Sequence, residues 1–191
     1  MANFSAAFGY DFEIVPVQNS LITDFASAPV ISGSSPASDA TVSYTAGVFT
    51  IGSTEYAMDG SDAPIRLAAL TNAALETDTG SEDIYTYDDE TSGFNQSVAT
   101  TKSFSVSLSG IADFNDVGYK ILRLTEQNTV ADGLRVAFRR VGPTGTTEEI
   151  VGYGTLTGYT ESNEVSSIVS WECTLTGYGP YHLTLANSAP A

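Results

Sequence analysis

Hydrophobic and polar residues alternate with a period of two along much of the second half of the chain. The clearest case is residues 169–176, where Trp171, Cys173 and Leu175 are separated by polar residues. Successive side chains of a β-strand point to opposite faces of the sheet. The alternation therefore predicts a half-buried antiparallel strand, in which Cys173 is a small buried hydrophobe.

Similar patterns predict strands elsewhere. Residues 102–110 place Phe104, Val106 and Leu108 on one face and serines on the other. A hairpin is predicted over residues 41–57, with a turn near Ala46-Gly47. The remaining predicted strands cover residues 55–58, 134–141, 149–157 and 164–176.

Helical spacing occurs twice. Asp62 precedes Pro64, and Leu67, Leu70 and Ala74 follow at helical intervals, which predicts a helix from residue 62 to 75. A second helix is predicted from Asp116 to about Gln127, with residues 113–115 as its cap and Val117, Ile121 and Leu124 as its inner face.

Two long segments show neither the two-residue period of a strand nor the spacing of a helix. Residues 1–40 contain short apolar clusters broken by prolines and are predicted to form an arm with one or two strands. Residues 76–101 are acidic and rich in Thr, Ser and Gly, which predicts a long loop that is either disordered or ordered against a neighbour. Its large apolar side chains are Ile84, Tyr85, Tyr87 and Phe94. Together the patterns predict one mainly β domain over residues 1–191, a β-sandwich or open barrel with one or two short flanking helices.

Charge restricts the function classes. The chain has 23 acidic and 7 basic residues, a formal net charge of −16, and no Lys or Arg before Arg66. Such a surface repels phosphates, so specific DNA or RNA binding is not expected. The N-terminal sequence lacks the basic and apolar regions of a signal peptide, and no apolar run is long enough for a membrane helix. Synthesis in the cytoplasm, without a membrane role, is therefore expected.

Few residues of the chain could carry catalysis or bind a metal ion. His182 is the single histidine, so a hydrolase triad would depend on it, and a strand or tail position without a catalytic role is the better interpretation. Asp78, Glu82 and Asp83 offer oxygen ligands for Ca²⁺, but the spacing of an EF-hand loop is missing. No catalytic, cofactor or metal site is predicted, and an enzyme is not expected.

Two stretches together resemble the major tail tube proteins of long-tailed bacteriophages. The acidic stretch 77–101 is followed by the alternating strand 102–110, and the chain then closes on the sequence from Trp171 to Pro180, which contains Gly177-Tyr-Gly179. The resemblance covers about residues 75–181. It implies a non-enzymatic virion protein, made in the bacterial cytoplasm, whose homohexameric rings stack into the tail tube and close a continuous inner β-barrel.

The resemblance also implies partners and contacts. Partners would be further copies of the chain and other tail components, namely terminator, baseplate or tip, tape measure protein and, where a tail has one, a sheath. DNA would pass through the lumen without specific binding. Ile84, Tyr85, Tyr87 and Phe94 would contact the next ring, and Arg135 and Arg139 would meet carboxylates at subunit contacts.

Two questions stay open at this level. The serine face of residues 102–110 suits either a lumen or an outer surface, so the lumen-lining strands are undecided. The alternative function is a β-sandwich binding module, such as a capsid decoration, baseplate or host-attachment protein, with tyrosines such as Tyr153, Tyr159, Tyr178 and Tyr181 stacking on sugars.

Overall fold

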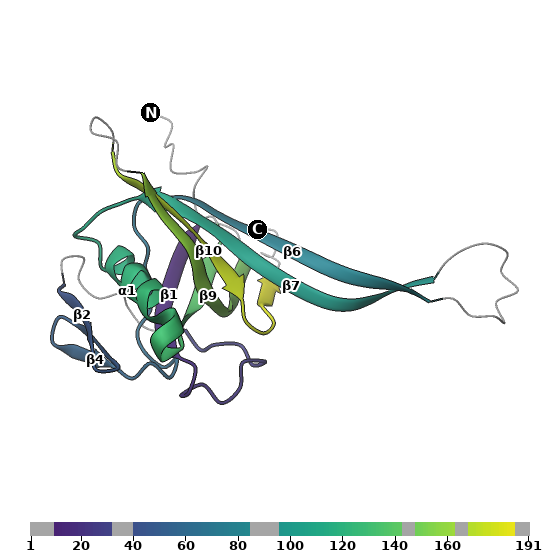
Figure 1. Cartoon of the computed structure of the whole chain (residues 1–191), viewed down its shortest axis with the longest axis horizontal. Helices are drawn as coiled ribbons and strands as arrows, with labels where there is room; N and C mark the ends of the chain where they lie inside the picture. Colours follow the sequence, from purple (N-terminus) through teal and green to yellow (C-terminus); the bar gives the residue numbers. More distant parts are fainter. Residues whose placement is uncertain (1–9, 32–39, 85–95, 143–147, 163–167, 186–191) are drawn as a thin grey trace, which may run out of the picture.

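A large antiparallel sheet dominates the structure, a computed structural model that describes residues 10–31, 40–84, 96–142, 148–162 and 168–185 (Figure 1). A separate three-stranded sheet is formed by β2 (Val42–Thr45), β3 (Val48–Ile51) and β4 (Thr54–Tyr56). The strands of the large sheet are, in spatial order, β5 (Ile65–Arg66), β1 (Asp11–Gln18), β8 (Leu134–Val141), β9 (Glu148–Ser162), β10 (Ser170–Gly177), β7 (Gln96–Ile111) and β6 (Leu70–Ile84), with β11 (His182–Leu185) paired to the start of β9.

The strands with clear alternation form as predicted. In β10, Trp171, Cys173 and Leu175 are buried, whereas Glu172 and Thr176 between and beyond them are exposed. β8 has the predicted bounds, and β2, β3 and β4 confirm the predicted hairpin and its third strand. The mainly β fold class is therefore confirmed.

The N-terminal region is less of an arm than the sequence predicts. β1 pairs with β8 over its whole length, and Phe12, Ile14, Val15 and Val17 are fully buried. The prolines that suggested an arm are compatible with this place, because Pro16 lies inside the sheet while β1 has only a two-residue neighbour, β5, on its other side. The rest of the predicted arm includes residues 1–9 and 32–39, which lie outside the described residues.

One helix, α1 (Val117–Asp132), packs on the large sheet. The Asp116 side chain accepts a hydrogen bond from the backbone N–H of Tyr119 at 3.0 Å and caps the N-terminus. Gly133 ends the helix in the left-handed conformation. The predicted start is confirmed within one residue, the cap predicted over residues 113–115 is wrong because Asp116 itself caps the helix, and the helix continues five residues beyond the predicted end.

The helix predicted over residues 62–75 is wrong. Asp62 does not cap a helix; its carboxylate accepts hydrogen bonds from the backbone N–H groups of Ala57 and Met58 after β4. β5 and the first part of β6 occupy the segment instead, with Leu75 paired to Val106. Pairing with an already amphipathic strand overrides a short and weak helical pattern.

The loop predicted over residues 76–101 is also wrong in its described parts. Residues 76–84 and 96–101 belong to β6 and β7, which are paired from Leu70↔Gly110 out to Ile84↔Gln96. The two strands project from the body as one long hairpin (Figure 1). The predicted loop is thus mostly a ladder of paired strands, and residues 85–95 lie outside the described residues.

Two apolar clusters lie on opposite sides of the large sheet. The larger one contains Phe138, Phe104 and Trp171 and is covered by α1 and the small sheet. The smaller one contains Val15, Ala137 and Tyr153 and is covered by Ile22 and Phe25 from the segment after β1. One half of the sheet is therefore packed on both faces, and the half formed by β10, β7 and β6 has one face that no described segment covers.

Candidate assembly surfaces

The uncovered face of β9, β10, β7 and β6 carries mainly small, polar or acidic side chains, with the exposed Ile111, which pairs with Ser170, as an apolar exception at one end. Residues paired across antiparallel strands project to the same face, and the burial of Phe104, Val106 and Leu108 directs the intervening serines of β7 outward. We call this set the polar face: Asn72, Ala74, Glu76, Asp78, Ser103, Ser105, Ser107, Ser109, Thr155, Thr157, Thr160, Ser162, Ser170, Glu172, Thr174 and Thr176. It contains three carboxylates and no Lys or Arg, and Arg135 of β8 meets it at the border, where its Nη1 donates to the Thr155 hydroxyl.

Hydroxyl groups tie the strands of the polar face together. The Thr157 hydroxyl lies 3.2 Å from the carbonyl oxygen of Thr174 and 3.3 Å from the hydroxyl of Thr176. The Thr160 hydroxyl donates to the Glu172 carboxylate at 3.1 Å. These contacts satisfy the small polar groups locally and leave a smooth, weakly acidic surface.

The four strands of the polar face end in two open edges. β6 pairs with β7 alone. On the other side, the pairing of β9 with β8 stops at Gly154, so Thr155–Ser162 pair only with β10 in the described structure. Unpaired N–H and C=O groups at sheet edges are templates for pairing with another chain.

The hairpin of β6 and β7 is mainly polar beyond the body, with Val98 as an exposed apolar side chain. Glu76, Asp78, Glu82 and Asp83 are exposed along β6. Of the residues predicted to contact the next ring, Ile84 ends β6 and pairs with Gln96, whereas Tyr85, Tyr87 and Phe94 lie outside the described residues. Their contact role stays a prediction.

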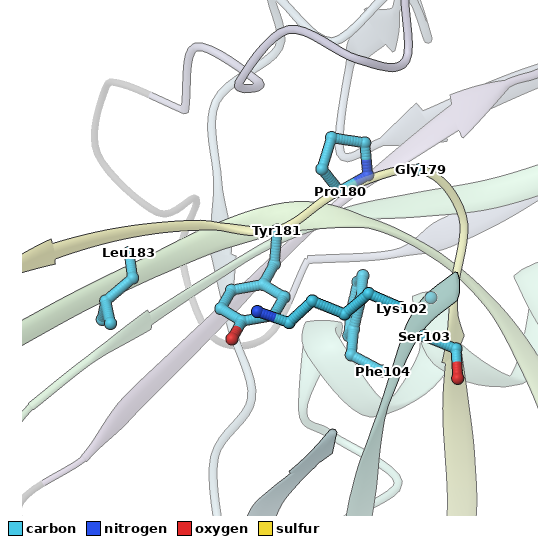
Figure 2. A pocket seen from close by; sticks show the side chains of 8 residues that line it. Lys102, Ser103, Phe104, Gly179, Pro180, Tyr181 and Leu183 are labelled. Atoms are coloured by element: carbon cyan, nitrogen blue, oxygen red, sulfur yellow. The ribbon is translucent and has the colours of Figure 1, made fainter. Parts of the chain in front are cut away.

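A groove of about 610 Å³ opens at the base of the hairpin, where β7 diverges from β11 (Figure 2). We call it the hairpin-base groove. Its walls are Lys102, Ser103 and Phe104 from β7 and residues 177–183, including Pro180, Tyr181 and Leu183. The Lys102 ammonium group stands 5.3 Å from the centre of the Tyr181 ring, a cation–π contact. No local sequence pattern predicts this groove, because its walls come from two segments that are distant in the chain.

Arg135 and Arg139 both make contacts within the chain. The Arg135 guanidinium lies 3.5 Å from the centre of the Tyr178 ring, and its Nε donates to Asn19 at 3.0 Å. Arg139 donates from Nε to the Glu13 carboxylate at 2.6 Å. Both arginines therefore anchor the segment around β1, and their predicted pairing with a neighbouring subunit stays a prediction.

The residues considered for chemistry occupy ordinary structural positions. Cys173 is buried, and burial, with a smaller effect of the Glu126 charge, raises the pKa of its thiol to about 12. His182 lies on β11 with Nε2 3.1 Å from the carbonyl oxygen of Ala26. Within the described ranges, no group of three or more His, Cys, Asp or Glu side chains is arranged to hold a metal ion, and no helix is long and apolar enough to cross a membrane.

A cluster that the sequence did not reveal joins α1 to β9. The Glu161 carboxylate accepts hydrogen bonds at 2.5 Å from the hydroxyls of Tyr119 and Tyr159. Burial, followed by the Glu161 hydrogen bond, raises the pKa of both tyrosines. Arg123 lies over the Tyr159 ring at 4.1 Å. Tyr159 is thus engaged inside the fold, which weakens its assignment as a sugar-stacking residue.

Solved structures with a similar fold come from gene transfer agent particles and from a tail tube. The chain superposes with a TM-score of 0.52 on a chain in the tail of an empty gene transfer agent particle, refined with C6 symmetry, at 16% identity over 66% of this chain and 89% of that chain. A chain in the virion of the native gene transfer agent particle gives a TM-score of 0.51 at 15% identity, covering 63% and 88%. The SPP1 tail tube gives 0.50 at 14% identity, covering 80% of each chain.

The chain has a tail tube fold. At these identities the likeness concerns the fold, and it agrees with the family resemblance of the sequence. No protein-family model and no curated protein matches the chain.

Proposed function

We propose that this chain is the structural subunit of a phage tail tube, without enzymatic activity. Copies associate side by side into rings with the polar face inward, and the rings stack into a hollow tube. The observation that carries the proposal is the polar face itself. It is a continuous surface that contains no Lys or Arg and ends at two open sheet edges.

The open edges support ring closure. The β6 edge of one copy and the Thr155–Ser162 edge of the next copy are different surfaces, so their contact is heterologous and gives a ring when the rotation between copies closes. Closure would bury both edges in a continuous barrel. Six copies are proposed, in line with the C6 symmetry of the gene transfer agent tail.

The chemistry of the polar face suits a DNA conduit. Proteins bind DNA mainly by neutralising phosphates with Lys and Arg, which releases counterions. The polar face has neither residue, and Glu76, Asp78 and Glu172 repel phosphates. DNA would therefore pass without being retained. The terminator, baseplate or tip, and tape measure protein are proposed partners, and the virion tail is the proposed location after synthesis in the bacterial cytoplasm.

Electron microscopy of the purified chain tests this function. Each copy carries a net charge of −16, so assembly should be followed at about 0.15 M salt or above, where the Debye length is about 8 Å or less. We expect rings and hollow tubes in negative stain, with a concentration-dependent rise in sedimentation coefficient. A monomer at every concentration and salt level would contradict the proposal and favour a binding module.

A further inference from the structure

The hairpin-base groove has the chemistry of a docking site for an acidic and aromatic segment. We propose that residues 82–94 of one copy, the end of the β6–β7 hairpin, bind in the hairpin-base groove of a second copy. The inference rests on the proposed tube assembly and identifies the surface that receives the hairpin when rings stack.

The groove offers a cation beside apolar walls. Phe104, Tyr181 and Leu183 line it, and Leu183 is about half exposed (49%) (Figure 2). Lys102 projects over Tyr181, and within the described residues no carboxylate is paired with it. Four of the other six basic residues, by contrast, are in ion pairs with carboxylates: Arg66, Arg123, Arg139 and Arg140. In such an acidic chain, an exposed ammonium group without a carboxylate partner, beside the apolar side chains of a groove, is a site for a carboxylate from elsewhere.

The hairpin end supplies the complementary chemistry. Residues 82–94 contain five carboxylates together with Ile84, Tyr85, Tyr87 and Phe94. The other short segments outside the described residues differ, since residues 1–9 have no acidic residue and residues 186–191 have no aromatic one. Aromatic side chains that fill a groove beside a charge contact are the usual anchors of protein interfaces.

The geometry requires a second copy. Thr79 pairs with Lys102, and the ladder continues outward to Ile84↔Gln96. At about 3.3 Å per residue, the end of the ladder lies about 20 Å from Lys102, and it points away from the body (Figure 1). Tyr85 and Phe94, which are one and two residues beyond the last ladder pair, reach the groove of their own copy only if this ladder breaks. Each copy thus has one hairpin end and one groove at different places, which is a heterologous contact that repeats along an open assembly.

Disulfide cross-linking tests whether residues 82–94 of one copy occupy the hairpin-base groove of another. The variant with Tyr85→Cys and Leu183→Cys should, in oxidised tubes, give a ladder of covalent dimers, trimers and longer chains on a non-reducing gel. Each single variant is the control and should remain monomeric, because Cys173 is buried. A monomeric double variant in tubes, or a bond within one copy, would overturn the proposal. So would a ladder from Phe8→Cys with Leu183→Cys and none from Tyr85→Cys, since the N-terminal segment would then be the occupant.

Charge reversal tests the contact without a covalent bond. Lys102→Glu should leave rings intact and raise the protein concentration needed for tube growth about tenfold, which corresponds to about 1.4 kcal/mol. Lys120→Glu on α1 carries the same charge change; it loses the hydrogen bond from Nζ to the Ala40 carbonyl oxygen, but Lys120 does not line the groove, so tube growth should be that of the unaltered chain. Asp88→Lys with Asp89→Lys should restore tube growth to Lys102→Glu.

The outcomes separate the two proposals. If the unaltered chain forms neither rings nor tubes, the proposed function fails and this inference fails with it. If the unaltered chain forms tubes and Lys102→Glu forms them at the same concentration, only the groove assignment is wrong.

Discussion

Gly177 makes room for the ring of Phe104: a Cβ atom at position 177 would lie 2.5 Å from Cδ1 of that ring. The two residues belong to β10 and β7, and Phe104 is buried. Phe104 also contacts the rings of Phe138 and Tyr181 at centroid distances of 5.9 and 5.2 Å. The glycine of the closing strand thus allows an aromatic contact that joins the core to the wall of the hairpin-base groove.

Gly177→Ala should lower the free energy of unfolding by about 1–3 kcal/mol, because the added methyl group overpacks the Phe104 ring. Urea denaturation measures the change. In a Phe104→Leu background, where the smaller side chain leaves space, the same substitution should cost less. Equal costs in both backgrounds would show that the two side chains do not compete for space.

Asp116 holds both the helix and the segment before β6. Its carboxylate accepts from Tyr119 N at 3.0 Å and from Ala68 N at 3.3 Å, and the residue is buried. Asp116→Ala should therefore lower the free energy of unfolding by about 1–2 kcal/mol, as for loss of an N-cap. Asp113→Ala, a nearby exposed carboxylate, is the matched control and should change stability by less than about 0.5 kcal/mol. A neutral Asp116→Ala variant would contradict the capping role.

Cys173 should give the stability an alkaline pH dependence. The pKa of its thiol is raised from 9.0 to about 12 in the folded chain, so the folded state holds the proton more tightly than the unfolded state. The resulting stabilisation is complete below about pH 9 and falls as the pH rises toward 12, by up to about 1.4 kcal/mol per pH unit. Unfolding of the unaltered chain and of Cys173→Ala should therefore converge above pH 9. A constant difference between the two would refute the shift.

Shortening the hairpin should separate ring formation from stacking. Thr79 and Lys102 are directly paired, so residues 80–101 can be replaced by Asn-Gly, which closes a two-residue hairpin turn. The body should keep its free energy of unfolding within about 1 kcal/mol, because residues 81–83 and 97–101 of the removed range are exposed. Negative stain should show rings without tubes. Tubes of normal length would mean that the hairpin plays no part in stacking.

The sequence predicted the strands that bury one face. Alternation in β8 and β10 is enforced by the core, since a shift of one residue would expose Phe138 or Trp171. The start of α1 was likewise predictable, although Asp116 itself is the cap and Gly133 was not predicted as the residue that ends the helix. The strands and the helix start were predictable because each carries its own local signal.

The errors occur where pairing with a distant segment decides the structure. The outer part of the hairpin, around Glu82 and Val98, is exposed on both strands, so no apolar period marks it and the sequence resembles a loop. Leu67 and Leu70 have helical spacing by coincidence: Leu67 packs against Gly118 of α1, and Leu70 begins β6. The open edge of β9 and the hairpin-base groove depend on where strands part, which no local pattern encodes.

Labelling of the polar face in assembled tubes tests the central claim most directly. Ser107→Cys lies in the middle of the polar face, and Ser53→Cys lies in the exposed turn between β3 and β4. A maleimide on a long polyethylene glycol chain should modify both variants as dissociated subunits. In tubes, Ser53→Cys should stay fully reactive and Ser107→Cys should be protected at least tenfold. Equal reactivity of the two in tubes would place the polar face outside and contradict the account.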